Sequence, residues 1–278
     1  MSVAAVILNY NDAENALSTA QHLQGFSNID QVILIDNGST DKSREVLSGF
    51  SGTVLWNEKN GGYGYGNNRG VQEASRLSCD LTLICNPDTE FSEETVDILK
   101  EAFLDPETAA AGGLMEGKKK TDCAWPLLSL SGEVRFSGPI LKRIFRNDVL
   151  YPESFFRTLP KPVGAVHGSL FMVRTADFLS AGGFDEQVFL FCEEKILGHR
   201  LRAIGKQVVL TGATYSHKGS ETMKRSGMDL LRRQKERQKS ERIFYRNYLQ
   251  AGPLRMIPVK AVQAAVLFET RLLSLFVK

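Results

Sequence analysis

The chain has 278 residues, 42% of them hydrophobic, so it can bury a full core as one large domain or as a domain with an appendage. Its formal net charge is only +2, but residues 218–246 hold ten Lys and Arg against four Asp and Glu. The four cysteines form no CxxC pair or Cys/His cluster, and no basic leader precedes the first apolar run, so we expect reduced thiols in a cytoplasmic protein.

Residues 1–115 alternate short β-rich runs with amphipathic segments. The sequence predicts strands over 3–10, 31–36, 52–57 and 80–85. It predicts helices from about Asp12, Asp41, Asn67 and Ser92, with Asp41 and Ser92 suited to capping. Strand–helix–strand alternation with short links is typical of a parallel sheet wound by helices. We therefore expect an α/β, Rossmann-like half.

The pattern changes after residue 117. Residues 118–162 predict an irregular insert over one edge of the sheet, followed by a strand-like run over 165–174, a helix near 193–204 and a strand near 207–210. Beyond residue 220 a basic helical stretch leads to a final amphipathic piece. We expect one domain over 1–220, with halves 1–115 and 116–220, and a basic, amphipathic helical tail over 221–278.

The last apolar segment, from Ala261, is the best candidate for a membrane span, but Glu269 and Arg271 interrupt it at a place where charge is expensive. The segment therefore predicts a helix that lies along a bilayer surface or packs on protein, either its own domain or a second subunit. Nucleic acid is a weaker interpretation of the basic tail, because no binding motif accompanies it.

Polar and glycine-rich stretches follow the predicted strands. "IDNGSTDKS" places short polar side chains and free amides at a strand's carboxyl end, and "NEKNGGYGYGNNRG" (57–70) allows close approach of a phosphate or sugar. A dinucleotide fingerprint would follow the first strand, whereas this loop follows the third. A dehydrogenase is therefore disfavoured.

Three further features carry carboxylates or imidazole. Asp88 ends the strand in "LTLICNPDTEF", and Mg²⁺ or Mn²⁺ held mainly through substrate phosphates needs only one or two protein ligands. Glu193 and Glu194 follow the apolar run "VFLFC", where a desolvated carboxylate can act as a base. Alone, adjacent acids usually form a solvated helical turn, and a single histidine such as His217 is usually structural.

Together and in order, six motifs resemble the family-two inverting glycosyltransferases with the GT-A fold, most closely a bacterial rhamnosyltransferase-like branch. The motifs are "VILNYND", "VILIDNGSTDKS", "NGGYGYGNNRG", "LICNPDTEF", "GSLFMVRTADFLSAGGFDEQVFLFCEE" and "YSHKGS". The resemblance covers residues 3–220, and "FYRNYL" (244–249) extends it into the tail. It implies a mostly parallel sheet flanked by helices, with a C-terminal helical extension.

The resemblance also implies roles for matching residues. On the donor side it places Asn9, Tyr10, Asp36 and Asn37 at the base and ribose, Asn60, Gly61 and Asn68 beside the nucleotide and diphosphate, and Asn86 and Asp88 in the DxD position. Elsewhere it places Asp88 and His217 at the metal, Gly183, Phe184 and Asp185 on the acceptor side, and Glu194 or Glu193 as the base.

Two departures from the family pattern bear on these roles. Asn86 stands first in the DxD position, which leaves one fewer acidic ligand, and Glu193-Glu194-Lys195-Ile196 replaces the usual Glu-Asp-x-Asp. A glutamate is one methylene longer than the expected aspartate. Either Glu194 reaches the acceptor by another rotamer, or Glu193 has taken the role, or the activity is weakened or altered.

The implied reaction is metal-dependent, inverting transfer from a dTDP- or UDP-linked sugar to a saccharide acceptor, lipid-linked, in cell-surface polysaccharide synthesis. The basic tail would then hold the enzyme at the anionic inner face of the membrane. Two alternatives stay open. One is a catalytically degenerate domain that serves as a binding or scaffold subunit, and the other is a sugar nucleotidyltransferase, although "LNYNDAEN" lacks the glycine-rich basic signature expected after the first strand.

Overall fold

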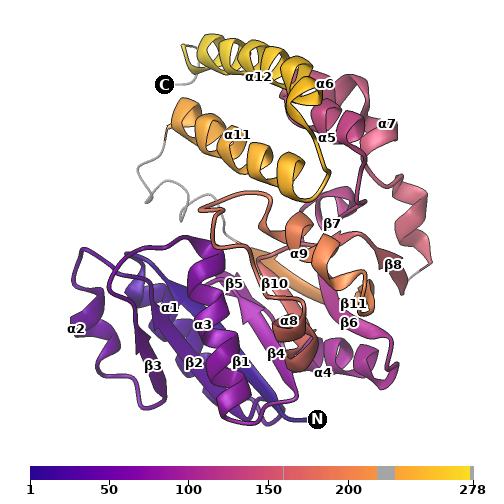
Figure 1. Cartoon of the computed structure of the whole chain (residues 1–278). Coiled ribbons are helices and arrows are strands. Elements are labelled where there is room, and N and C mark those ends of the chain that lie inside the picture. The colour runs from indigo at the N-terminus through magenta and orange to yellow at the C-terminus, as the bar shows by residue number, and fades with distance from the viewer. Residues whose placement is uncertain (159, 218–228, 276–278) are drawn as a thin grey trace.

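The computed structural model describes residues 1–158, 160–217 and 229–275. Over this range one mixed sheet crosses the molecule in the order β3-β2-β1-β4-β10-β6-β11-β5, and β8 pairs with β11 (Figure 1). The first four strands are mutually parallel where they pair, and β11 runs parallel to β6. β10 is antiparallel to both β4 and β6. The expected mostly parallel α/β sheet with flanking helices is confirmed.

The elements have the following bounds. The strands are β1 (Val3–Asn9), β2 (Gln31–Asp36), β3 (Thr53–Trp56), β4 (Leu81–Cys85), β5 (Thr89–Glu90), β6 (Thr108–Met115), β7 (Ala124–Trp125), β8 (Lys161–Val163), β9 (Ala165–Val166), β10 (Leu170–Arg174) and β11 (Lys206–His217). The helices are α1 (Ala13–Gln24), α2 (Ser43–Leu47), α3 (Tyr63–Arg76), α4 (Glu93–Glu101), α5 (Leu130–Phe136), α6 (Pro139–Ile144), α7 (Arg146–Val149), α8 (Thr175–Ser180), α9 (Glu193–Leu201), α11 (Leu230–Asn247) and α12 (Pro253–Ser274), with short 3₁₀ turns η1 (Ala102–Leu104), η2 (Lys120–Asp122) and η3 (Glu153–Arg157).

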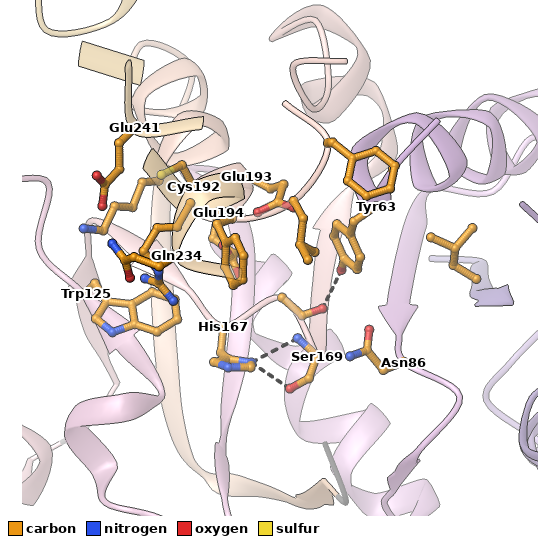
Figure 2. A pocket seen from close by; sticks show the side chains of 18 of the residues that line it. Tyr63, Asn86, Trp125, His167, Ser169, Cys192, Glu193, Glu194, Gln234 and Glu241 are labelled. Atoms are coloured by element: carbon orange, nitrogen blue, oxygen red, sulfur yellow. Dashed lines mark hydrogen bonds between the residues drawn. The ribbon is translucent and has the colours of Figure 1, made fainter. Parts of the chain in front are cut away.

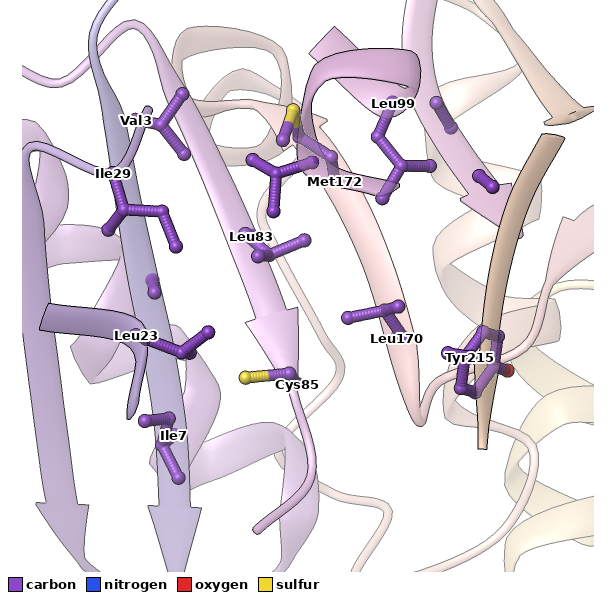
Figure 3. Close-up of a cluster of buried hydrophobic side chains, with 14 of the residues drawn as sticks. Val3, Ile7, Leu23, Ile29, Leu83, Cys85, Leu99, Leu170, Met172 and Tyr215 are labelled. Atoms are coloured by element: carbon purple, nitrogen blue, oxygen red, sulfur yellow. The ribbon is translucent and has the colours of Figure 1, made fainter. Parts of the chain in front are cut away.

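Alternate residues of the central strands face two separate cores. Val3, Ile7 and Leu83 pack with Leu23 of α1 and Leu99 of α4 on one face (Figure 3). On the other face the intervening strand residues pack against α3, α8 and α9. Because both faces are covered, β1, β2 and β4 are nearly continuous apolar runs, as expected for parallel strands.

Two predicted strands differ from the observed ones. The run over 165–174 is divided into β9 and β10, because residues 167–169 form a turn between them. The predicted strand near 207–210 is the start of the much longer β11, whose end at His217 pairs with Thr89 of β5. β11 therefore reaches from its pairing with β6 and β8 to β5, shortly after the carboxyl end of β4.

The glycine-rich segment is more helical than predicted. α3 begins at Tyr63 rather than near Asn67. A Cβ on Gly66 would lie 2.2 Å from Leu8, and one on Gly70 would lie 2.4 Å from Val6, so these glycines let α3 approach β1 closely. Their main structural role is thus helix–sheet packing, rather than the approach of a phosphate that the sequence predicted.

The two predicted capping residues differ in outcome. Ser92 caps α4, since its hydroxyl accepts the Thr95 amide. Asp41 was expected to cap the next helix, but α2 begins only at Ser43 and its N-cap position is Lys42. The Asp41 carboxylate instead accepts the Ser43 amide at 2.9 Å, one position before the cap.

The segment over 118–162 contains more regular structure than predicted. It forms the short helices α5, α6 and α7, which lie next to α12 (Figure 1). A Cβ on Gly138 would lie 2.6 Å from Val266, so the start of α6 is in close contact with α12.

The tail packs on its own domain through α11. Phe244 and Tyr245 of α11 are buried with Ile196 of α9 and with Met256 and Val259 of α12. Tyr248 donates to Asp185 at 2.9 Å, which joins "FYRNYL" to the 182–185 turn. Among the described residues, no helix is both long enough and apolar enough to cross a bilayer.

Candidate active site

A cavity of about 910 Å³ opens where the carboxyl ends of β1, β2 and β4 meet the 167–169 turn, the start of α9, the helical insert and α11. Figure 2 shows side chains from these separate segments around it. Open α/β sheets bind ligands outside the carboxyl ends of their strands. Of the residues predicted from the sequence, those that line the cavity are Tyr10, Asn37, Asn60, Asn86, Glu193, Glu194 and His217.

Asn37 connects the predicted donor segments. Its amide donates to Asn60 Oδ1 and to the Gly62 carbonyl, both at 3.0 Å, and accepts from Asn57 at 2.9 Å. Gly62 has a φ of +95°, and a Cβ there would meet the Phe189 carbonyl oxygen at 2.3 Å. The end of β2, the glycine-rich segment and the loop before α9 therefore form one rigid wall.

Asn9 and Asp36 lie beneath this wall and are not among the residues that line the cavity. Asn9 donates to Asp36 Oδ1 at 2.8 Å and accepts the Asp12 amide at 3.0 Å, while Asp36 Oδ2 accepts the Ser39 amide. The two side chains position the loops after β1 and β2.

Five further predicted residues do not line the cavity. Asn68 donates to the Phe184 carbonyl and accepts the Phe184 amide, and thus clasps the 183–185 turn instead of facing the cavity. Gly183, Phe184 and Asp185 lie on the far side of α3, where they line a separate, smaller pocket of about 300 Å³ with Asn68. Gly61 packs beneath the Tyr65 ring.

Asp88 and His217 meet at the edge of the cavity. The β5–β11 pairing brings His217 Nε2 to 3.2 Å from Asp88 Oδ1, and Asn86 Nδ2 lies 3.3 Å from the same nitrogen. Among the described residues, no three His, Cys, Asp or Glu side chains converge as a complete metal cage. A carboxylate and an imidazole nonetheless fit a divalent ion whose other ligands are phosphate oxygens and water.

Glu193 and Glu194 begin α9 directly after Phe191 and Cys192, two residues with left-handed backbone at φ 71° and 69°. Burial raises the pKa of both carboxyl groups. Glu193 is buried and its Oε1 has no hydrogen-bond partner in the described structure, whereas Glu194 is half-buried and accepts a hydrogen bond from the Gly168 backbone. Glu194 is therefore the more accessible of the two carboxylates.

Several cavity residues were not predicted as functional. Tyr63 donates to the Gly168 carbonyl at 2.6 Å, which holds the turn beside Glu194. Burial, followed by the proximity of His217, lowers the pKa of His167 to about 4, and its ring lies 5.4 Å from Trp125. Gly168, inside a run interpreted as one strand, was the available signal for this turn. Gln234 and Arg237 come from α11, which no local pattern connects with the cavity.

A comparison with protein families matches residues 4–178 to the model described as glycosyl transferase family 2. The chain belongs to this family. The family model thus covers Asp36, Asp88 and the 167–169 turn, but not α9 or α11.

Curated relatives match roughly two thirds of the chain. An N-acetylglucosaminyl-diphospho-decaprenol L-rhamnosyltransferase of Mycobacterium tuberculosis is 29% identical in an alignment 194 residues long, which covers 63% of this chain and 61% of the relative. The low-salt glycan biosynthesis hexosyltransferase Agl10 of Haloferax volcanii is 24% identical and is matched over 72% of this chain and 61% of its own length. The matched part is thus about 61% of each relative.

Solved structures show the same fold at low identity. GalNAc-T7 with UDP, GalNAc and Mn²⁺ superposes with a TM-score of 0.56 at 15% identity, over 78% of this chain and 44% of that one. Residues 1–349 of S. aureus TarS superpose with a TM-score of 0.55 at 14% identity, over 97% of this chain and 81% of that one. The expected GT-A fold is confirmed.

Proposed function

We propose that this protein is an inverting glycosyltransferase that moves a sugar from a dTDP- or UDP-linked donor to a saccharide acceptor joined to a lipid diphosphate, in cell-surface polysaccharide synthesis. The observation that carries the proposal is the cavity itself. It joins the strand ends at Tyr10 and Asn37, the Asp88–His217 pair at its edge and the carboxylate of Glu194. The relatives with a rhamnosyltransferase and a hexosyltransferase name support the reaction class.

The donor would bind along the wall made by Tyr10, Asn37 and Asn60, with its diphosphate toward Asp88 and His217. These two residues would hold a divalent ion, which when bound neutralises the departing diphosphate. Asn86 lies beside the same imidazole and would orient it. Asn9 and Asp36 act one layer further back, because they hold the loops that carry this wall.

Glu194 would take the proton from the acceptor hydroxyl as that oxygen attacks the anomeric carbon. A raised pKa suits a general base that works near neutral pH. The Gly168 amide fixes one carboxylate oxygen, and Lys195 and Arg237 favour the ionised form electrostatically. Inversion is expected from the family resemblance, and the anomeric configuration of the product, measured by NMR, checks it.

A lipid-linked acceptor would place the enzyme at a membrane surface, and α12 supports this. Its exposed apolar residues include Leu254, Ile257 and Phe268. Its only acid, Glu269, is half-buried with its carboxylate on the Ile140 amide, whereas its basic residues are exposed. We propose that this outer face of α12 lies on an anionic leaflet.

Thermal unfolding with dTDP, UDP and GDP, each with Mn²⁺ or Mg²⁺, tests the donor assignment. One nucleotide should raise the unfolding midpoint, because a ligand that binds only the folded state stabilises it. EDTA or the Asp88→Ala substitution should remove the metal-dependent part of the shift. The absence of a shift with every nucleotide would count against the function.

A further inference from the structure

The cavity extends well beyond Glu194, on the side away from the wall made by Tyr10, Asn37 and Asn60. This far lobe is closed by α6 of the insert, which lies within the family model, and by α11 of the tail, which lies outside it. Lys142, Gln234 and Arg237 line it. In Figure 2, Gln234 lies near Trp125, while Tyr63 and Asn86 mark the opposite side of Glu194.

These three side chains are hydrogen-bond donors without a polar acceptor. Within residues 1–158, 160–217 and 229–275, neither Lys142 nor Arg237 forms an ion pair, and the buried Gln234 Nε2 has no hydrogen-bond partner. Lys142 Nζ lies 4.6 Å from the centre of the Phe136 ring, and the Arg237 guanidinium lies 4.5 Å from that of Phe191. Aromatic rings hold both cations in place but leave their donors available.

The three donors are close to one another. Gln234 and Arg237 are three residues apart on α11 and so share one face of the helix. Lys142 and Lys195 stand over the same Phe136 ring, and the positive charge of Arg237 acts directly on Lys142. Burial lowers the pKa of Lys142, Asp122 opposes this effect, and Arg237 and Lys195 lower the pKa further. Such a cluster of partly desolvated cations is stabilised by an anion.

Acidic residues also line this part of the cavity, but most are compensated. Glu133 accepts from Lys195 at 2.5 Å, so that pair is neutral overall. Burial raises the pKa of Glu241 to about 7 and also raises that of Glu193. Near neutral pH these two carboxyls therefore carry reduced negative charge. Asp122 also lines the cavity and acts on Lys142, so the lobe sets the positive charges of Lys142 and Arg237 against this one carboxylate.

We propose that Lys142, Gln234 and Arg237 form a subsite for the phosphate groups of the acceptor, which rests on the proposed function and assigns the acceptor end of its cavity. α6 runs between this subsite and the protein surface. Lys142 of α6 lines the cavity, whereas Ile140 and Ile144 of the same helix are 56% and 66% exposed beside α12. The acceptor's lipid then lies on this apolar face, its diphosphate on the three donors and its sugar hydroxyl at Glu194.

Binding of farnesyl diphosphate and of inorganic pyrophosphate, followed by intrinsic fluorescence, tests this assignment without any nucleotide. Lys142→Met and Arg237→Gln should each weaken the binding of farnesyl diphosphate about tenfold, as expected for loss of a charge-assisted contact to phosphate. Arg143→Met and Lys239→Gln are matched controls. They remove the same charge from exposed positions of the same two helices and should change the affinity less than about twofold, because exposed charges are screened.

The same variants are then tested for the thermal shift produced by UDP or dTDP with Mn²⁺. An unchanged shift shows that the variants fold and that the donor site is separate. Equal loss of nucleotide and farnesyl diphosphate binding would assign the cations to the donor and overturn the proposal. It is also overturned if the control variants match the cavity variants, or if pyrophosphate binds and farnesyl diphosphate does not. A protein that binds farnesyl diphosphate through these residues but no nucleotide would refute only the proposed function.

Discussion

Glu193 and Glu194 are consecutive carboxylates whose surroundings differ because a helix turns successive side chains by about 100°. Both line the cavity, but Glu193 is buried and its Oε1 lacks a partner in the described structure, whereas Glu194 is half-buried and accepts the Gly168 amide. The two residues that the sequence left as alternatives for the base therefore have different surroundings. Their roles can be tested individually.

We expect Glu194→Gln to lower kcat by about 10²- to 10⁴-fold, the usual contribution of a general base, and Glu193→Gln to lower it much less. Burial raises the pKa of Glu194 above its ordinary 4.5, so the base becomes protonated, and activity falls, as pH decreases through that raised value. The acidic limb of the wild-type kcat profile should therefore lie above pH 4.5. Nucleotide-induced thermal shifts control for folding, and a larger loss in Glu193→Gln than in Glu194→Gln would reverse the assignment.

At the scale of elements, the contact between the start of α3 and the loop before α9 shapes the cavity wall along which we propose that the donor binds. Gly62 is the residue that permits it, because its φ is positive and its α-carbon faces the Phe189 backbone. A clash at this position could not be relieved by a change of rotamer, because the neighbouring atoms belong to the Phe189 main chain. The contact also positions the apolar run that leads into Glu193.

Gly62→Ala should destabilise the fold by roughly 1–2 kcal/mol for the left-handed backbone and by about 1–3 kcal/mol more for the clash. Urea unfolding measures the change. Gly117→Ala is the matched control, because Gly117 also has a positive φ (+68°) but a Cβ there would meet nothing within 4 Å. Similar losses in both variants would show that the clash with Phe189 is unimportant.

At the scale of the whole molecule, α12 has one face against α11 and another toward solvent. Met256, Val259 and Val266 are buried, whereas Leu254 is 82%, Ile257 63% and Phe268 64% exposed. Packing on protein is thus observed for one face of the tail, while the membrane contact stays a proposal for the other. α11 packs on the domain, and the exposed face of α12 is suited to the membrane contact proposed above.

The double variant Ile257→Glu/Phe268→Glu should lose most of its binding to vesicles that contain phosphatidylglycerol, measured by flotation. The variant removes apolar area that would be buried in the bilayer, and it adds negative charge that the anionic surface repels. Leu104→Glu is the control, since Leu104 is 76% exposed but lies in η1, outside α12. Wild-type protein that stays unbound at every lipid composition would contradict the membrane contact.

Much of the donor side was predictable from local sequence. Parallel strands with apolar runs must end at one edge of the sheet, and the residues after β1, β2 and β4 must then lie near one another. Tyr10, Asn37 and Asn86 accordingly line one cavity. Asp88 was expected near a metal because it follows the end of a predicted strand and matches the family motif. In the structure His217, also expected near the metal, lies next to it.

The sequence by itself determined the strands of the parallel half and the carboxylates near their ends, because apolar periodicity and strand–helix alternation are local properties. Only the tertiary structure decided that Asn68 supports the 183–185 turn and that α6 and α11 complete the cavity around Glu194. These outcomes depend on contacts between residues far apart in the chain, such as Asp88 with His217 and Asp185 with Tyr248. Such contacts depend on how whole helices and strands pack together, and no local sequence pattern specifies that packing.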